Sequence, residues 1–220
     1  MKITKKRFVL IALFIFPLIF FLVLSTGINN FKKLPVLTQK VKDLNEVDSV
    51  QTVTFSDHVS VLCFLGKDID TKKGGLFNLN QKIYKEFYGY LPFQIIAVYP
   101  KGSEDQIQKL RSSIEKFTDM SKWHFIGLSE ESISSLFQSL RTNDNLNQFY
   151  TNKAYIVDKN SSLRGRNDDK DSVDGLLFGY NFNSVGELNN KMEDDIKVLL
   201  YEYRAAFKNK KKADRKKVEL

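Results

Sequence analysis

The sequence predicts an α/β fold in which helices cover both faces of a mixed central sheet, giving three layers. Compact apolar runs suited to buried strands alternate with segments whose apolar residues recur at helical spacing. This alternation is typical of a largely parallel sheet. Further along, two short strand segments flank the polar turn 158–161, which predicts an antiparallel hairpin. An apolar run at residues 8–24 precedes all of these elements.

The N-terminal run predicts one transmembrane helix over residues 8–25. A spanning helix needs about 17–25 apolar residues, whereas the core of a cleaved signal peptide has roughly 7–15. The basic segment 1–7 precedes the run, so the positive-inside rule places this segment in the cytoplasm. We therefore expect an uncleaved, single-pass signal anchor in inner-membrane lipid, with the folded domain in the periplasm. Ser25-Thr26-Gly27 could serve as a signal-peptide cleavage site, so a cleaved segment is the alternative to an anchor.

The formal net charge of +8 is concentrated at the two ends of the chain. The segment 1–7 holds four Lys/Arg residues, and the tail 208–220 holds seven against two acidic residues. The remainder is almost balanced, which argues against a nucleic-acid footprint on the domain. The basic tail continues the last predicted helix as a solvated end, and contact with anionic headgroups is the alternative.

The predicted strands follow from apolar runs and from one alternating segment. Residues 26–48 are polar and Lys-rich around Leu34-Pro35, and we expect a stalk there. The predicted domain occupies 49–207, and alternation at its start indicates an edge strand. The predicted strands span 50–55, 59–65, 93–99, 123–128, 154–157 and 163–166.

The predicted helices follow from capping residues and apolar stripes. Ser103 with Gln106, and Ser184 with Glu187, fit the capping box, while Ser129 caps a shorter helix between them. An earlier helix has its apolar residues between 79 and 87. The last helix carries a stripe that spacings of three and four place on one face. That stripe is Val185, Leu188, Met192, Ile196, Leu199, Tyr203 and Phe207.

This order of elements is the one expected of a thioredoxin-like domain. Besides the anchor and Leu34-Pro35, the chain contains several short blocks in a fixed order: 123–127 (WHFIG), 154–159 (AYIVDK), 163–166 (LRGR), 179–181 (GYN) and 185–192 (VGELNNKM). In these features, over most of residues 8–207, the chain resembles the SCO/SenC family of membrane-anchored thioredoxin-fold proteins. The resemblance implies an assembly role linked to cytochrome c oxidase, because the family delivers copper to the CuA centre of that enzyme.

The family's copper site is missing from this sequence. The family binds copper through a CxxxC pair after the first buried strand and through a distant histidine, and soft thiolates with imidazole suit copper. The matching positions here are Ile69, Lys73 and Tyr150, and Cys63 is the single cysteine. Thiol–disulfide exchange needs two thiols. We therefore expect a divergent member of the fold that has no metal or other cofactor and is not an enzyme.

Four other features each have a structural and a functional interpretation. Cys63 lies in an apolar strand and is expected to pack there, with a reactive thiol as the alternative. A metal site from His58, Cys63 and His124 would require three strands to converge.

An acidic cluster resembles a calcium loop, but Val173 takes a ligand position in it, so we expect a solvated loop. The cluster consists of Asp168, Asp169, Asp171 and Asp174. The loop 66–75 is basic and glycine-containing, and anion binding is the alternative to a plain connection.

The function expected from the sequence is that of a membrane-anchored, non-catalytic scaffold or assembly factor in the bacterial cell envelope. Its partner would be a protein of respiratory-complex assembly. The expected interaction residues are the loop lysines Lys67, Lys72 and Lys73 and the aromatic residues Tyr84, Tyr88 and Tyr90. The alternative is a thiol- or metal-dependent redox protein that uses Cys63 or a non-standard site.

Overall fold

The computed structural model describes residues 5–25 and 33–218, and the chain divides into two compact units. The first unit ends at Lys32 and contains the helix α1 (Lys5–Ser25). The second unit, from Lys33 onward, is the α/β domain.

The prediction of a transmembrane helix at 8–25 is not supported. A helix does form there, but no helix within the described ranges combines the length and apolar character needed to cross a bilayer. Lys5 and Lys6 lie in its first turn, and its described apolar side chains run from Val9 to Val23.

A mixed sheet forms the centre of the domain, as predicted, and it has seven strands among the described residues. Its strand order is β1-β6-β5-β2-β3-β4, and β7 pairs with β5. The pairs β2–β3 and β3–β4 are parallel, whereas β5 is antiparallel to β2, β6 and β7. The strands are β1 (Val36–Thr38), β2 (Val59–Leu65), β3 (Phe93–Pro100), β4 (Trp123–Leu128), β5 (Tyr150–Val157), β6 (Leu163–Arg164) and β7 (Tyr180–Asn181).

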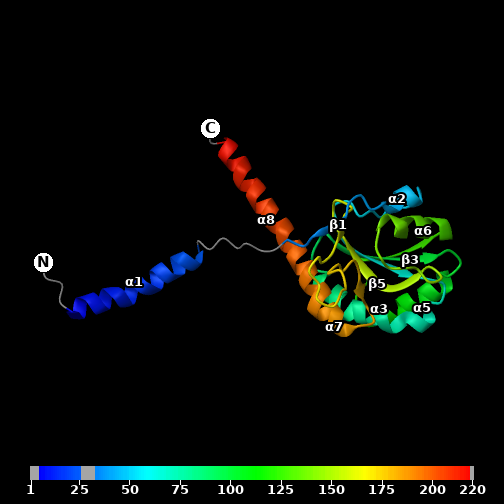
Figure 1. Cartoon of the computed structure of the whole chain (residues 1–220), viewed down its shortest axis with the longest axis horizontal. Helices are drawn as coiled ribbons and strands as arrows, with labels where there is room; N and C mark the ends of the chain where they lie inside the picture. Colours follow the sequence, from blue (N-terminus) through cyan, green and yellow to red (C-terminus); the bar gives the residue numbers. More distant parts are fainter. Residues whose placement is uncertain (1–4, 26–32, 219–220) are drawn as a thin grey trace. The chain divides into compact units, whose positions relative to one another are not determined.

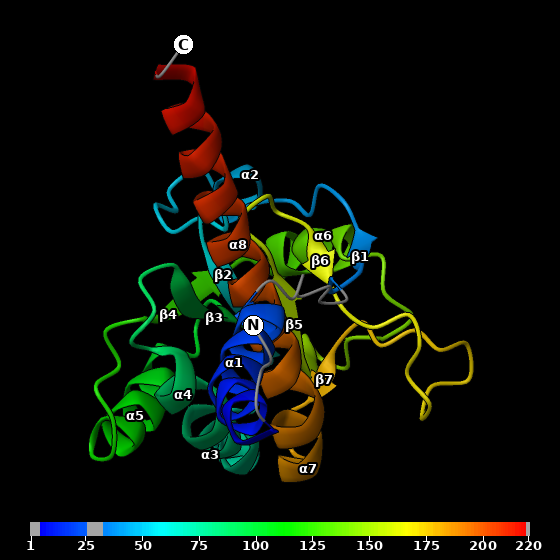
Figure 2. The ribbon, with the colours of Figure 1, turned by 90° about the vertical axis from the view of Figure 1, so that its left-hand side faces the viewer.

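Helices cover both faces of this sheet, and each face has its own apolar core (Figure 1). On one face lie α2 (Leu44–Val47) and α6 (Glu130–Ser139). All the other helices of the domain pack on the opposite face, where α3 and α7 lie side by side in both ribbon views (Figure 2). These are α3 (Lys73–Leu79), α4 (Lys85–Phe87), α5 (Glu104–Glu115), α7 (Val185–Glu187) and α8 (Glu193–Val218), together with the 3₁₀ turn η1 (Asp70–Lys72) and the π-helical segments η2 (Asn80–Tyr84) and η3 (Leu188–Met192).

The topology is thioredoxin-like, as predicted. A parallel β-α-β unit, β2 to β3, is followed by the antiparallel pair β5–β6 and by a terminal helix packed on the sheet. Strand β2 lies between β3 and β5 and is buried along its whole length. Because β2 is central, the loop after its carboxyl end emerges at the middle of one sheet edge.

The N-terminal boundary of the domain differs from the expected stalk at 26–48. Residues from Lys33 onward belong to the folded unit, and β1 pairs with β6 as the edge strand. The predicted edge strand at 50–55 is irregular instead. The Asp43 carboxylate explains this, because it accepts the Leu44 N–H at the start of α2 and also the Phe55 N–H at 2.9 Å. The buried Phe55 is thereby fixed without a strand partner.

The hydroxyl caps at Ser129 and Ser184 and the middle of the apolar stripe are confirmed, whereas the Glu187 side chain accepts the Asn181 N–H instead of closing a capping box. The Ser129 hydroxyl accepts the N–H of Ser132, and the Ser184 hydroxyl accepts that of Glu187. Ser103 makes no such bond. The middle of the stripe, from Leu188 to Leu199, is buried, but its two ends are not. Val185 is 43% exposed and Phe207 is 70% exposed.

Candidate functional site

The candidate site lies where the loop after β2 meets the start of β5. Gly66 turns the chain with a φ of +66°, a conformation that favours glycine. A Cβ at this position would lie 2.7 Å from the Cβ of Tyr150 and 2.9 Å from the Gln148 carbonyl oxygen. The β2–β5 register shifts between Cys63 and Leu65, so that Leu65 lies opposite Tyr150. The loop backbone is therefore held directly against β5.

Two lysines of this loop lie over two aromatic rings. The Lys72 Nζ is 4.1 Å from the centroid of the Tyr150 ring, and the Lys67 Nζ is 5.5 Å from that of Phe149. Lys67 also forms an ion pair of 2.5 Å with Glu130 at the start of α6. We call these four residues, Lys67, Lys72, Phe149 and Tyr150, the lysine–aromatic cap. A cation–π contact stabilises such an arrangement by about 0.5–1 kcal/mol at exposed sites.

The loop that carries Ile69 and Lys73 contacts β5 through Lys72 and Tyr150, but the side chains at the matching positions do not fit copper. Ile69 is completely buried in the core, and it offers no ligand atom. Lys73 is paired with Asp70 at 2.5 Å. Tyr150 is half-buried, and burial raises the pKa of its phenol. A metal ion would meet ammonium groups here rather than thiolates, so these residues do not form a copper site.

Cys63 is part of the core, not of the site surface. It is fully buried and lies opposite Ala154 and Ala97 on the neighbouring strands. Burial raises the pKa of its thiol far above the ordinary value. The thiolate is the reactive form, so this environment makes Cys63 a poor nucleophile.

The structure does not bring the two histidines to Cys63. Cys63 packs in the core cluster that contains Val61 and Leu65. On β4, alternation places His124 on the same face as Ile126, which belongs to the core of the opposite face. The pKa of His124 is lowered by its burial and then by His58. Within the described ranges, His, Cys, Asp and Glu side chains form no group of three that could hold a metal ion.

The acidic loop around residue 170 is neutralised by a lysine from η3. The Lys191 Nζ lies 2.7 Å from a carboxylate oxygen of Asp169 and 2.7 Å from one of Asp171. Asp174 accepts the N–H of Leu176 and the side-chain amide of Asn143. A protein cation thus occupies the place that a calcium interpretation would give to the metal.

The three predicted aromatic residues separate into core and surface. Tyr84 is fully buried, and its hydroxyl accepts the Lys122 N–H at 3.1 Å. Tyr84 therefore packs as a core residue and is not available as an interaction residue. Tyr88 and Tyr90 are 47% and 38% exposed.

Sequence reasoning did not identify Phe149. Its φ is +64° and that of Gln148 is +50°, so two successive residues adopt a left-handed backbone just before β5. The only sequence signal was a second aromatic residue beside Tyr150. Nothing in the local sequence indicates that Lys67 would lie over it, since the two are far apart in the chain.

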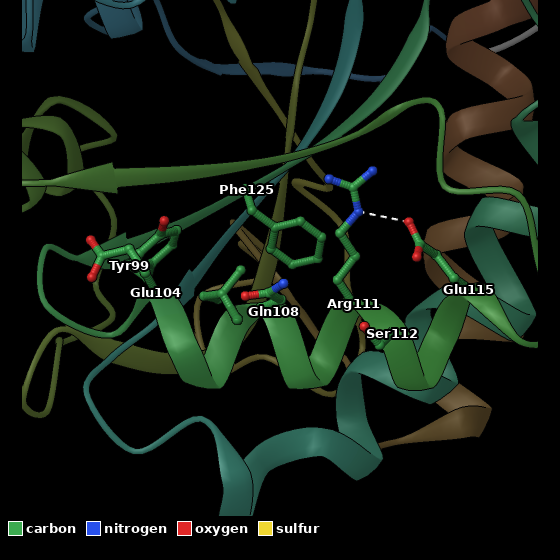
Figure 3. A pocket seen from close by; sticks show the side chains of 8 residues that line it. Tyr99, Glu104, Gln108, Arg111, Ser112, Glu115 and Phe125 are labelled. Atoms are coloured by element: carbon green, nitrogen blue, oxygen red, sulfur yellow. Dashed lines mark hydrogen bonds and ion pairs between the residues drawn. The ribbon is translucent and has the colours of Figure 1, made fainter.

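An open pocket lies along α5 (Figure 3). Its volume is about 530 Å³, and Tyr99 and Phe125 contribute the aromatic part of its wall. Arg111 and Glu115, both on α5, form an ion pair of 2.7 Å beside it. This pocket shares no residue with the lysine–aromatic cap.

Comparison with known proteins finds no matching family model and no matching curated protein. Similar solved structures include BsSco, a member of the Sco family of cytochrome c oxidase assembly proteins in which a disulfide switch was identified. BsSco is 14% identical, with a TM-score of 0.48, over 76% of this chain and 96% of that chain.

Two further solved structures are similar. A SCO1/SenC family lipoprotein from Bacillus anthracis is 16% identical, with a TM-score of 0.37, over 76% of this chain and 100% of that chain. A protein from Bacteroides thetaiotaomicron described as a protein disulfide isomerase is 11% identical, with a TM-score of 0.40, over 78% of this chain and 92% of that chain. The structural neighbours thus include proteins of the family that the sequence resembles.

Proposed function

We propose that this chain is a non-catalytic binding protein built on a thioredoxin-like domain, with the lysine–aromatic cap as its contact surface. The observation that supports this most strongly is the chemistry of the cap itself. The end of β2, where a redox or copper protein of this fold would present thiolates, presents Lys67 and Lys72 over aromatic rings. Such a surface suits a protein partner with exposed carboxylates.

The cap has the features of a contact surface rather than of a reaction centre. Lys67 is about half exposed, so it can exchange its pairing with Glu130 for a partner's carboxylate. Beneath it, the tight approach of Gly66 to Tyr150 keeps the backbone of the cap in one position. A pre-organised surface loses less conformational entropy when it binds.

Copper titration tests the non-catalytic part of this proposal. The purified protein is expected to show no stoichiometric Cu(I) or Cu(II) binding tighter than about 1 μM, the range in which binding free energies exceed roughly 8 kcal/mol. Stoichiometric binding below that value would refute the proposal. It would favour the alternative, a metal-dependent protein that uses a non-standard site.

Photo-crosslinking tests the contact surface. A photoreactive phenylalanine analogue at Phe149 keeps the aromatic ring of the cap, and the same analogue at Val50, which is 81% exposed, is the matched control. Position 149 should capture a defined protein in native membranes, and position 50 should not. The sequence resemblance leads us to expect a protein of cytochrome c oxidase assembly. Equal capture at both positions would contradict the cap as contact surface.

We also propose that the chain is held at the membrane of the cell envelope by its N-terminal segment. The described apolar side chains of α1, from Val9 to Val23, are exposed all around the helix, and Lys5 and Lys6 precede them. An apolar surface of this size is not stable in water. Cell fractionation should leave the chain with the membranes, and its recovery in the soluble fraction would refute the attachment.

A further inference from the structure

An uncovered aromatic surface lies where the turn after α4 meets α8. It consists of five residues from two segments that are more than a hundred positions apart in the chain. We call it the aromatic face. Its members are Tyr88 (47% exposed), Tyr90 (38%), Leu91 (90%), Tyr201 (40%) and Phe207 (70%).

Contacts between α8 and the preceding segment bring the two parts of this face together. Lys197, Tyr201 and Arg204 follow one another at spacings of four and three, so they share one side of α8. The Arg204 guanidinium carbon lies 5.8 Å from the centroid of the Tyr90 ring, and the Lys197 Nζ lies 4.0 Å from a Glu86 carboxylate oxygen. Phe207 lies one turn further along α8, on the neighbouring side that carries the apolar stripe of the helix.

The turn that carries Tyr90 and Leu91 is fixed in place although its side chains are uncovered. The Lys122 Nζ donates to the Tyr90 carbonyl oxygen at 2.5 Å, and the Tyr88 ring stacks on the buried Tyr84 at 5.9 Å. A leucine at 90% exposure on such a fixed turn adds nothing to the core. A cluster of exposed apolar residues is typical of a surface that binds another molecule or a membrane.

The charge that follows in α8 indicates what this surface binds. The helix continues to Val218, and the sequence from 208 to 217 contains seven Lys/Arg residues and one Asp. Tyrosines beside a lysine cluster are typical of segments that lie at anionic membrane surfaces. The combination of apolar side chains and adjacent positive charge therefore favours lipid over a protein partner.

We propose that the aromatic face, together with the basic end of α8, rests on an anionic bilayer surface. Leu91 and Phe207 enter the headgroup region, and the positive charge of the sequence 208–217 is attracted to the anionic lipid. This inference rests on the proposed membrane attachment of the N-terminal segment, which brings the domain near a bilayer. It adds a second contact, and that contact sets the orientation of the domain.

An environment-sensitive fluorophore in the full chain tests this contact. Cys63 is buried, so Leu91→Cys can be labelled selectively with a nitrobenzoxadiazole dye, and Val173→Cys, which is also fully exposed, provides the matched control. Each labelled chain is reconstituted into vesicles of phosphatidylcholine alone or with about 30% phosphatidylglycerol, a composition that imitates an anionic leaflet. Flotation of the vesicles first shows whether the chain is attached.

The expected result is a blue shift and an emission increase of at least about twofold at position 91, in anionic vesicles only, as the dye leaves water. Raising the salt to 1 M shortens the Debye length from about 10 Å to about 3 Å and should reverse the change. Replacing the six lysines at 208, 210, 211, 212, 216 and 217 by glutamine should abolish it.

The other outcomes refute either the membrane attachment or the lipid contact. Failure to float refutes the membrane attachment within the proposed function. Flotation without a change at position 91, as expected if the face binds a protein instead, refutes the lipid contact alone. An equal change at position 173, or an equal change in vesicles without phosphatidylglycerol, also overturns this inference.

Discussion

Replacing Arg164 by methionine is expected to lower the free energy of unfolding of the domain by about 3–5 kcal/mol, because it leaves buried carboxylates without a counter-ion. Arg164 is almost fully buried on β6, between β1 and β5. Its guanidinium joins three segments: the turn after β5, the residues before β1, and α8. Methionine retains most of the aliphatic volume and removes only the charge and its hydrogen bonds.

The magnitude follows from the partners that Arg164 leaves behind. Its Nη1 donates to Asp158 at 2.9 Å and its Nη2 to Glu202 at 2.8 Å, while its Nε donates to the Leu34 carbonyl at 2.9 Å. The side chains of Asp158 and Glu202 are only 2% and 13% exposed. Breaking a buried ion pair on one side costs about 3–5 kcal/mol, since the remaining charge is not rehydrated.

A matched control is the exposed pair of Arg111 and Glu115. Its Nε–Oε1 distance of 2.7 Å is shorter than the distances in the buried pairs, but both side chains are about half exposed. Arg111→Met should therefore cost less than about 1 kcal/mol. Distance is thus held nearly constant between the two variants, and burial is the difference that the experiment measures.

Urea unfolding followed by the fluorescence of Trp123, the single tryptophan, gives the free energies. If buried charge is the cause, adding Asp158→Asn and Glu202→Gln to Arg164→Met should recover part of the loss. A loss below about 1 kcal/mol for Arg164→Met, or additive losses in the triple variant, would refute the reasoning.

Three other outcomes are expected. Because burial raises the pKa of the Cys63 thiol, Cys63 in the native protein should react with iodoacetamide more than about 1,000-fold more slowly than Cys63 in the unfolded chain. Rapid alkylation of the native protein would support the redox alternative. Gly66→Ala should lower the free energy of unfolding by about 1–3 kcal/mol, because of the positive φ and the contact with Tyr150. Gly74→Ala should leave this free energy unchanged or raise it, because nothing lies within 4 Å of a Cβ at that position. Equal effects of the two substitutions would contradict the close approach of Gly66 to Tyr150. Because burial and His58 lower the pKa of His124, its contribution to stability is present above about pH 6.5 and lost as the pH falls from there through the folded-state pKa. The urea midpoint of His124→Asn should lose that part of the pH dependence, and an unchanged profile would show that His124 does not contribute.

The candidate site was only partly predictable from the sequence. Its location at the end of β2, and the absence of thiol and histidine ligands, follow from counting residues along the chain. The pairing of Lys72 with Tyr150 does not, because it depends on the register between β2 and β5. The burial of Tyr84 was missed because a tyrosine with helical spacing fits either the core or the surface.

The sequence by itself determined the mixed sheet, the order of its strands along the chain, and the apolar faces of the main helices. These depend on local periodicity and capping, which a single segment carries. Only the tertiary structure decided that residues 33–48 join the domain, that a lysine neutralises the acidic loop, and which aromatic residues stay uncovered. Each of these depends on contacts between segments far apart in the chain. Asp43 with Phe55, Lys191 with Asp169, and Arg204 with Tyr90 are such contacts, and no local pattern specifies them.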